Sequence, residues 1–136
     1  MPMSAIRPLP LVLASLLAAA CAYADGAKGD AATGDPAKGK ELFTASACST
    51  CHSVTKDDNS SVGPNLVGVV GRQAGAVKSL IGPSENLKKY GVTWDAQTLD
   101  EFLTNPSAKV PGTAMIGILA DPQQRADVIA YLSTLK

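Results

Sequence analysis

Apolar residues recur at helical spacing in several segments of this chain, and no segment alternates convincingly with a period of two. The first predicted helix covers residues 36 to about 47. Asp35 can cap it, and Pro36 suits its first position, where a missing N–H costs nothing. Its apolar stripe consists of Leu42, Phe43 and Ala47. The pattern predicts an all-α fold class with long loops.

Two further helical patterns follow in the second half of the chain. A short helix is predicted from Ser84 to Lys89, with a stop at Gly91. A clearer helix follows Asp95 and stops at Asn105, because Pro106 disfavours helical geometry in the residue before it. The apolar face of this clearer helix consists of Leu99, Phe102 and Leu103.

The last predicted helix begins at Asp121 and Pro122, which repeat the start signal of the first, and runs to the C-terminus. Its apolar positions are Val128, Ile129, Leu132 and Leu135. Between residues 56 and 82, small and polar residues are frequent and no period persists, which predicts a long loop. Such a loop is uncommon in a compact domain unless it wraps something functional.

The first 24 residues have the pattern of a secretory signal peptide. Arg7 supplies a positive charge, residues 11–20 form an apolar run, and Ala22-Tyr23-Ala24 has the small-x-small form of a cleavage site. The apolar run is shorter than the roughly 20 residues that span a bilayer. We therefore expect cleavage after Ala24 and a periplasmic location.

Lipid attachment at Cys21 is a minor alternative, because residues 18–21 faintly resemble a lipoprotein box. After cleavage we expect a flexible lead-in at residues 25–34 and one domain over residues 35–136. Lys and Arg total 12 and balance 12 Asp and Glu, so the composition does not indicate a nucleic-acid binder.

Few thiol, thioether and imidazole side chains remain once residues 1–24 are removed. They include Cys48, Cys51 and His52, and the Cys48-Ser49-Thr50-Cys51-His52 pattern is typical of covalent c-type haem attachment. Two thiols at this spacing can form thioethers with the two vinyl groups of a porphyrin. The histidine that follows is carried beneath the iron as an axial ligand. One such motif allows one haem.

Three other interpretations of the motif remain open at this point. A thioredoxin-like redox pair would need a preceding strand, where the pattern predicts a helix. A disulfide between Cys48 and Cys51 is plausible in an oxidising compartment. A zinc site would need four ligands, and only two cysteines and one histidine are available.

Met115 is the candidate for the second axial ligand. His52 is the only histidine, which excludes bis-histidine ligation within the chain, and Met115 is the only thioether outside the leader. It lies in a Pro-Gly loop at residues 109–115, which suits a ligand held by backbone constraint. A methionine that only fills the core would be better placed on a helical stripe. Methionine and histidine ligation together raise the reduction potential.

The chain resembles class I cytochrome c, of the mitochondrial cytochrome c and bacterial cytochrome c2 type, over nearly all of residues 36–135. Besides the haem motif, the matching stretches are Lys38-Gly39-Lys40 with Phe43, Gly63-Pro64-Asn65-Leu66, Gly68, Gly71-Arg72, Gly91-Val92-Thr93-Trp94, Thr98-Leu99, Asn105-Pro106, Pro111-Gly112-Thr113 and Arg125-Ala126-Asp127 with Ile129-Ala130-Tyr131-Leu132. This resemblance implies the class I fold, in which the N- and C-terminal helices pack around one covalently bound haem.

The resemblance also implies roles for single residues. The Pro64 carbonyl would accept the Nδ1 proton of His52, which orients that ligand and increases its basicity. Arg72 and Trp94 match positions that neutralise or hydrogen-bond the haem propionates, and Thr113 matches another polar contact beside them. Gly39, Phe43 and Tyr131 match the packing contact between the first and last helices.

Three departures from the family pattern bear on function. A tyrosine-containing stretch of the family corresponds only loosely to residues 78–81, so one propionate donor is missing. Phe102 stands where mitochondrial relatives have a tyrosine near the methionine sulfur. The dense lysine ring around the haem edge is also missing. In that half of the chain the lysines are Lys56, Lys78, Lys88, Lys89 and Lys109.

The resemblance therefore predicts a periplasmic one-electron carrier, not an enzyme, that works as a monomer with one haem c. Its expected partners are periplasmic or membrane-bound redox proteins, including cytochrome complexes, oxidases and dehydrogenases, through transient contacts. One alternative is a haem enzyme or sensor with a displaceable sixth ligand, although no second histidine can serve there as acid or base. Another is a dedicated electron-accepting subunit of one dehydrogenase or oxidase.

Overall fold

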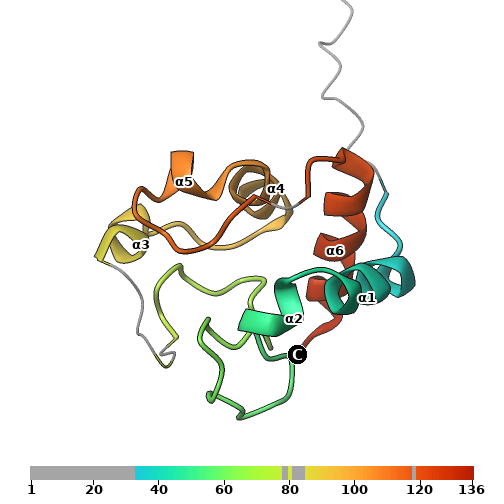
Figure 1. Ribbon diagram of the computed structural model, residues 1–136, viewed down its shortest axis with the longest axis horizontal. Coiled ribbons are helices and arrows are strands. Elements are labelled where there is room, and N and C mark those ends of the chain that lie inside the picture. Colours follow the sequence, from blue (N-terminus) through green and yellow to red (C-terminus); the bar gives the residue numbers. More distant parts are fainter. Residues whose placement is uncertain (1–32, 78–79, 81–84, 118) are drawn as a thin grey trace, which may run out of the picture.

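The computed structural model describes residues 33–77, 80, 85–117 and 119–136 (Figure 1). In these ranges the helices are α1 (Pro36–Ala45), α2 (Cys48–Cys51), α3 (Glu85–Tyr90), α4 (Ala96–Thr104), α5 (Pro106–Lys109) and α6 (Pro122–Thr134). The described residues contain no strand, only an isolated antiparallel bridge between Gln73 and Thr93. The predicted all-α class is confirmed.

Several sequence-based expectations concern residues that the structure does not describe. The signal peptide at residues 1–24 and most of the lead-in at residues 25–34 lie outside the described residues, as do the first residue of the predicted short helix, Ser84, and most of residues 78–81. Among the helices that are described, none has both the length and the apolar character needed to cross a membrane.

Three helices begin with the same pair of a polar capping residue and a proline. The Asp35 carboxylate accepts the Ala37 N–H at 2.9 Å to start α1, and Asp121 caps α6 in the same way. Asn105 caps α5 by accepting the Ala108 N–H at 3.1 Å. This signal predicted the starts of α1 and α6, but no helix was predicted after Asn105. The loop predicted from Lys109 also begins too early, because Asn105 both ends α4 and starts α5, which runs to Lys109.

Two other boundaries differ from the predicted ones. The first helix ends at Ala45, because Ser46 is extended, and a separate turn of helix, α2, follows it and contains both cysteines. The last helix ends at Thr134, two residues before the C-terminus. Capping at Asp95 and the stop at Asn105 agree with the predicted bounds of α4.

Helices α1 and α6 pack on each other at one side of the molecule (Figure 1). Gly39 makes this possible, since a Cβ atom there would overlap the backbone carbonyl of Asp127 on α6. One turn later the rings of Phe43 and Tyr131 meet, with centroids 5.7 Å apart. The contact between the first and last helices that the resemblance implied is therefore present.

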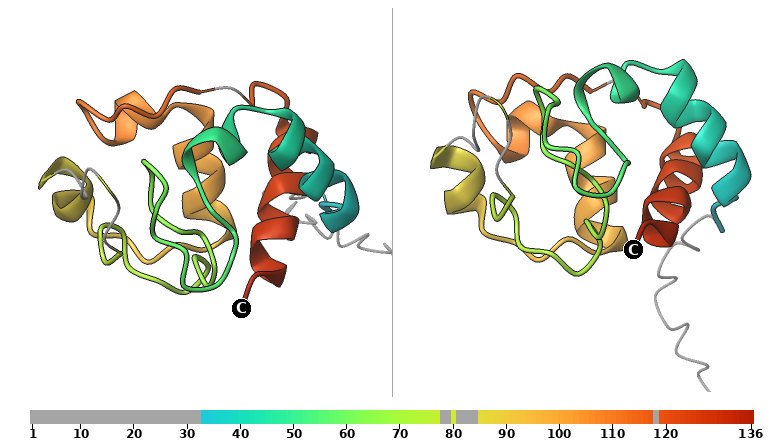
Figure 2. Two further views of the ribbon diagram at one scale, coloured as in Figure 1. Left: turned by 60° about the horizontal axis from the view of Figure 1, so that its bottom comes forward. Right: turned by 90° about the horizontal axis from the view of Figure 1, so that it is seen from below.

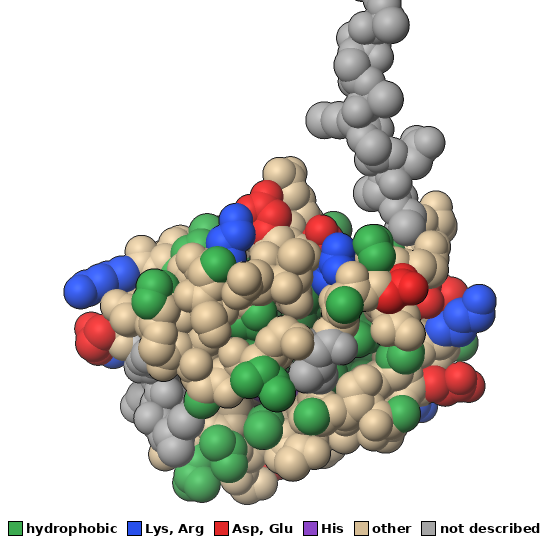
Figure 3. All heavy atoms as spheres, turned by 45° about the horizontal axis from the view of Figure 1, so that its top comes forward, with side chains coloured by type: hydrophobic (Ala, Val, Ile, Leu, Met, Phe, Trp, Pro, Cys, Tyr) green, Lys and Arg blue, Asp and Glu red, His purple; other side chains and the backbone are tan. Residues whose placement is uncertain are grey.

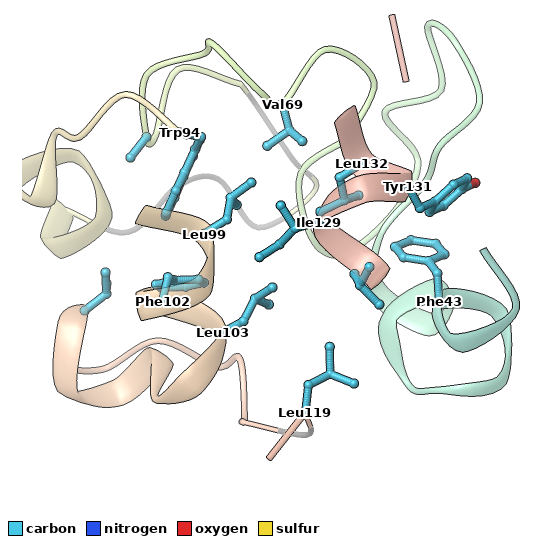
Figure 4. Close-up of a cluster of buried hydrophobic side chains, with 13 residues drawn as sticks. Phe43, Val69, Trp94, Leu99, Phe102, Leu103, Leu119, Ile129, Tyr131 and Leu132 are labelled. Carbon is cyan, nitrogen blue, oxygen red and sulfur yellow. The ribbon is translucent and has the colours of Figure 1, made fainter. Parts of the chain in front are cut away.

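The hydrophobic core lies between these terminal helices and α4 (Figure 4). Its α4 side chains are Leu99, Phe102 and Leu103, and its α6 side chains include Val128, Ile129 and Leu132, all buried as predicted. Val69 joins the core from the predicted loop, which contains no helix or strand in its described residues. This loop runs from α2 past α4 (Figure 2).

Candidate functional site

The haem motif forms α2 and its C-terminal cap. Cys48 and Cys51 are one helical turn apart, so both thiols project from one side of the turn. Cys48 is half-buried, Cys51 is exposed, and both are free thiols. His52 leaves the helix with φ −119° and ψ 131°, while its N–H still donates to the Cys48 carbonyl at 2.9 Å. The motif thus presents two thiols and an imidazole from five consecutive residues.

The imidazole of His52 is held by the loop that follows it. Its Nδ1–H donates to the Pro64 carbonyl at 2.8 Å, as the resemblance implied. Nε2 makes no hydrogen bond with any described residue, so it is the nitrogen available for a metal. Burial lowers the pKa of His52, although the hydrogen bond to Pro64 acts in the opposite direction. The ring therefore favours the neutral form that ligates metals.

Gly63 is a site residue whose role the sequence analysis did not assign. A Cβ atom at this position would lie 2.6 Å from Cε1 and 2.7 Å from Nδ1 of His52. Its N–H also donates to the Cys51 carbonyl at 2.7 Å, which ties the loop back to the motif. Only glycine leaves room for the imidazole here, and a glycine directly before Pro64 was the signal that could have identified it.

Asn65 organises the loop that carries the Pro64 carbonyl. Its side-chain amide donates to the carbonyls of Thr55 at 2.7 Å and Asp58 at 2.6 Å, and its Oδ1 accepts the Val67 N–H at 2.8 Å. Asn65 itself is buried. Asn65 appears in the family pattern, but nothing in the local sequence indicates contacts with residues up to ten positions away.

Asp58 supports the same loop through its carboxylate. Ser53 Oγ–H donates to Oδ2 at 2.7 Å, and the hydroxyl and N–H of Ser60 donate to Oδ1 at 2.6 and 3.0 Å. These hydrogen bonds, those of Ser60 first, lower the pKa of Asp58 to about 2. Asp58 lies in the predicted long loop, and no local pattern indicated this cluster.

Backbone pairing brings the two expected propionate-binding residues together. Gly71 N–H donates to the Trp94 carbonyl at 2.7 Å, and Trp94 N–H donates to the Arg72 carbonyl at 2.9 Å. Two N–H groups of the Arg72 guanidinium donate to the carbonyls of Asn65 at 2.7 Å and Val67 at 2.9 Å. A guanidinium has five donors, so Arg72 can bind the loop and still contact a second group.

The ring of Trp94 is buried, and it meets Phe102 edge-on with centroids 5.1 Å apart. Tyr90 of α3 packs against Trp94 at 5.9 Å. The indole N–H of Trp94 makes no hydrogen bond with the described residues, so it remains a free donor in that part of the chain.

Met115 lies on the segment between α5 and α6, which runs past α3 and α4 (Figure 1). The side chain is half-buried and packs against the hydrophobic core. Its N–H donates to the Thr113 hydroxyl at 3.2 Å. Thr113, expected at the propionates, is therefore also a local constraint on the backbone of Met115.

The donor set fits a covalently bound haem better than the other interpretations of the motif. Burial raises the pKa of the Cys48 thiol, whereas redox-active cysteines need a lowered one. In the described part of the chain a helix, not a strand, precedes the motif. The same part contains no group of three or more His, Cys, Asp and Glu side chains that could hold a metal ion. Two thiols, an imidazole with a free Nε2 and one thioether suit a haem c.

Comparison with known proteins finds one family over most of the chain. The family model for cytochrome c matches residues 36–136. Cytochrome c2 from Rhodomicrobium vannielii is 43% identical over 133 residues, which cover 97% of each chain. Cytochrome c-554 from Methylosinus trichosporium is 42% identical over 119 residues, 86% of this chain and 87% of its own. Cytochrome c from Ginkgo biloba is 40% identical over 104 residues, 76% of this chain and 90% of its own.

Proposed function

Because the chain belongs to the cytochrome c family, we propose that it carries one haem c and passes single electrons between redox proteins. When bound, the haem supplies the one-electron chemistry. The observation that carries the proposal is the His52 imidazole, held at Nδ1 by Pro64 and free at Nε2 beside two thiols. The protein's own contribution is to hold these groups, to exclude water from one side of the haem and to bury the apolar surface of the haem.

We assign Cys48 and Cys51 to the thioether bonds, and His52 and Met115 to the axial positions of the iron. The hydrogen bond to Pro64 increases electron donation from His52 and fixes its ring orientation. Met115 supplies a soft thioether from the α5–α6 connection, where its backbone is bonded to Thr113. With His52 and Met115 both bound, the iron would have no open position, which argues against a haem enzyme or gas sensor.

Arg72, Trp94 and Thr113 complete the proposed haem-binding set. Arg72 and Trp94 are adjacent through their backbones, and each retains N–H donors that a propionate would accept. A propionate between them would pair its negative charge with the guanidinium. Thr113 would reach the same group with its hydroxyl.

We further propose that residues 1–24 direct export to the periplasm, that the mature domain is residues 35–136, and that its partners are redox proteins bound transiently. On the face shown in Figure 3, Lys and Arg side chains lie interspersed with Asp and Glu. A surface without a dominant sign suits brief contacts with several partners better than one tight complex. Release of a chain beginning at Asp25, read by N-terminal sequencing of the exported protein, tests the leader.

Covalent attachment is tested on denaturing gels stained for haem. The wild-type band should stain, and acidified organic solvent should leave the haem with the protein. Cys48→Ser and Cys51→Ser should each weaken retention, whereas Ser49→Ala, between them, should behave as the wild type. Complete extraction of haem from the wild-type protein would refute the attachment.

Axial ligation is tested by spectroscopy of the oxidised protein. The wild type should be low-spin and show the weak thioether-to-iron charge-transfer band. Met115→Ala should abolish that band and lower the reduction potential. A wild-type protein that is already high-spin would instead favour the enzyme or sensor with an open sixth position.

A further inference from the structure

Arg125 is a buried charge at the start of α6. The residue is only 7% exposed. Nε–H donates to the Asp100 carboxylate at 2.7 Å, and one terminal nitrogen donates to the carbonyls of Leu119 at 3.0 Å and Ala120 at 2.9 Å. A buried guanidinium must be satisfied in this way, because an unpaired charge in the interior is strongly unfavourable.

These contacts join three parts of the chain. The bond to Asp100 links α6 to α4, and the two carbonyl bonds hold the segment that enters α6. Leu119 is itself 3% exposed and belongs to the hydrophobic core. The backbone at Leu119 and Ala120 is therefore anchored by burial and by a charged donor together.

The same segment carries Met115, four residues before Leu119. At the other end it is anchored at Val110, which is buried, and by the Asn86 amide, which donates to the Pro111 carbonyl at 2.7 Å. Between the anchors Ala114 and Ile116 are exposed. Four residues span at most about 14 Å, so the position of the Leu119 anchor limits where Met115 can lie.

We propose that Arg125 is a positioning residue for Met115. By holding the carbonyls of Leu119 and Ala120, it keeps the thioether on the iron and opposes its displacement by external ligands. This inference rests on the proposed function, specifically on Met115 as an axial ligand. It assigns to Arg125 a role beyond the clamp between α4 and α6.

The test is titration of the ferric holoprotein with imidazole, which competes with the thioether for the iron. Arg125→Gln should tighten imidazole binding by about tenfold or more, the factor expected when hydrogen bonds from a charged donor are lost. Arg125→Lys retains the charge but cannot span both carbonyls and Asp100, so it should give an intermediate change. Arg125→Lys also provides the readout if Arg125→Gln fails to fold.

Two control variants separate positioning from general destabilisation. Asp100→Asn leaves both carbonyl bonds of Arg125 in place. Asp127→Asn weakens the hydrogen bond that the Asp35 N–H donates to the Asp127 carboxylate, on the side of α6 that faces α1. Both should lower thermal stability and leave the imidazole affinity within about twofold of the wild type.

An Arg125→Gln affinity equal to that of a control of the same stability would overturn the inference and leave Arg125 as a structural clamp. Tightening in Asp100→Asn equal to that in Arg125→Gln would also overturn it, since the carbonyl bonds would then be irrelevant. A wild-type spectrum without the thioether band would refute Met115 ligation itself, and the inference with it.

Discussion

The His52 imidazole donates its Nδ1 proton to the carbonyl oxygen of Pro64 at 2.8 Å. This bond joins the haem motif to the long loop and sets the direction in which Nε2 points. Because it makes the ring a stronger electron donor, it would favour ferric iron and lower the reduction potential of a haem ligated by His52. The geometry depends on Gly63, which borders the ring without a side chain.

Gly63→Ala should disturb this bond. Its new Cβ would fall 2.6 Å from His52 Cε1, so the imidazole or the loop must shift. Overpacking of this kind costs about 1–3 kcal/mol of stability. A weaker hydrogen bond should also raise the potential and accelerate solvent exchange of the Nδ1 proton, which NMR detects. Gly68→Ala is the control, because a Cβ there meets no atom within 4 Å and only its positive φ of 66° is strained. Equal exchange rates in both variants would contradict the prediction.

Asp58→Asn should reduce stability at neutral pH and make the protein less sensitive to acid. The carboxylate has a pKa of about 2, below its ordinary value of 3.8, because Ser60 and Ser53 donate to it. Its contribution is therefore complete above pH 4 and is lost as the pH falls towards 2. Thermal denaturation measured across this pH range should show the melting temperatures of the wild type and the variant converging as the pH falls. Asp57→Asn is the control, since the Asp57 carboxylate accepts no hydrogen bond from the described residues and should show no such convergence.

Phe102→Tyr tests whether a hydroxyl at this position reaches the axial sulfur. Phe102 is 8% exposed and packs edge-on against Trp94. A hydrogen bond to the Met115 sulfur would weaken its donation to ferric iron and shift the potential upward by about 10–40 mV. Met115 should then also be displaced more easily at alkaline pH. Redox titration decides the matter: an unchanged potential with lower thermal stability would mean that Phe102 only packs in the core.

The rate of electron transfer to partner proteins should depend only weakly on ionic strength. Removal of residues 1–24 leaves a net charge of about −1, and the visible surface mixes charges of both signs (Figure 3). Long-range steering needs a concentrated patch of one sign, which ions then screen. Stopped-flow rates measured between low and physiological ionic strength provide the test. A steep decline would reveal such a patch and contradict the prediction.

Local signals predicted most of the helices because caps and apolar spacing act within one or two turns. Asp35-Pro36 and Asp121-Pro122 each mark the start of a helix. The apolar faces of α4 and α6 were predicted from the spacing of apolar residues alone. The α5 helix was missed although Asn105-Pro106 is the same kind of signal. Asn105-Pro106 was interpreted only as the end of α4, although it also starts α5.

The sequence by itself determined the all-α class, the bounds of α4 and the haem motif, because each depends on residues that are neighbours in the chain. Only the tertiary structure decided which distant residues support them. Asn65 bonds to residues seven and ten positions away, and Arg125 bonds to Asp100 across 25 positions. Such contacts depend on the path of the loops between them, which apolar spacing does not encode. They also need burial to become strong, and burial exists only once the helices have packed together.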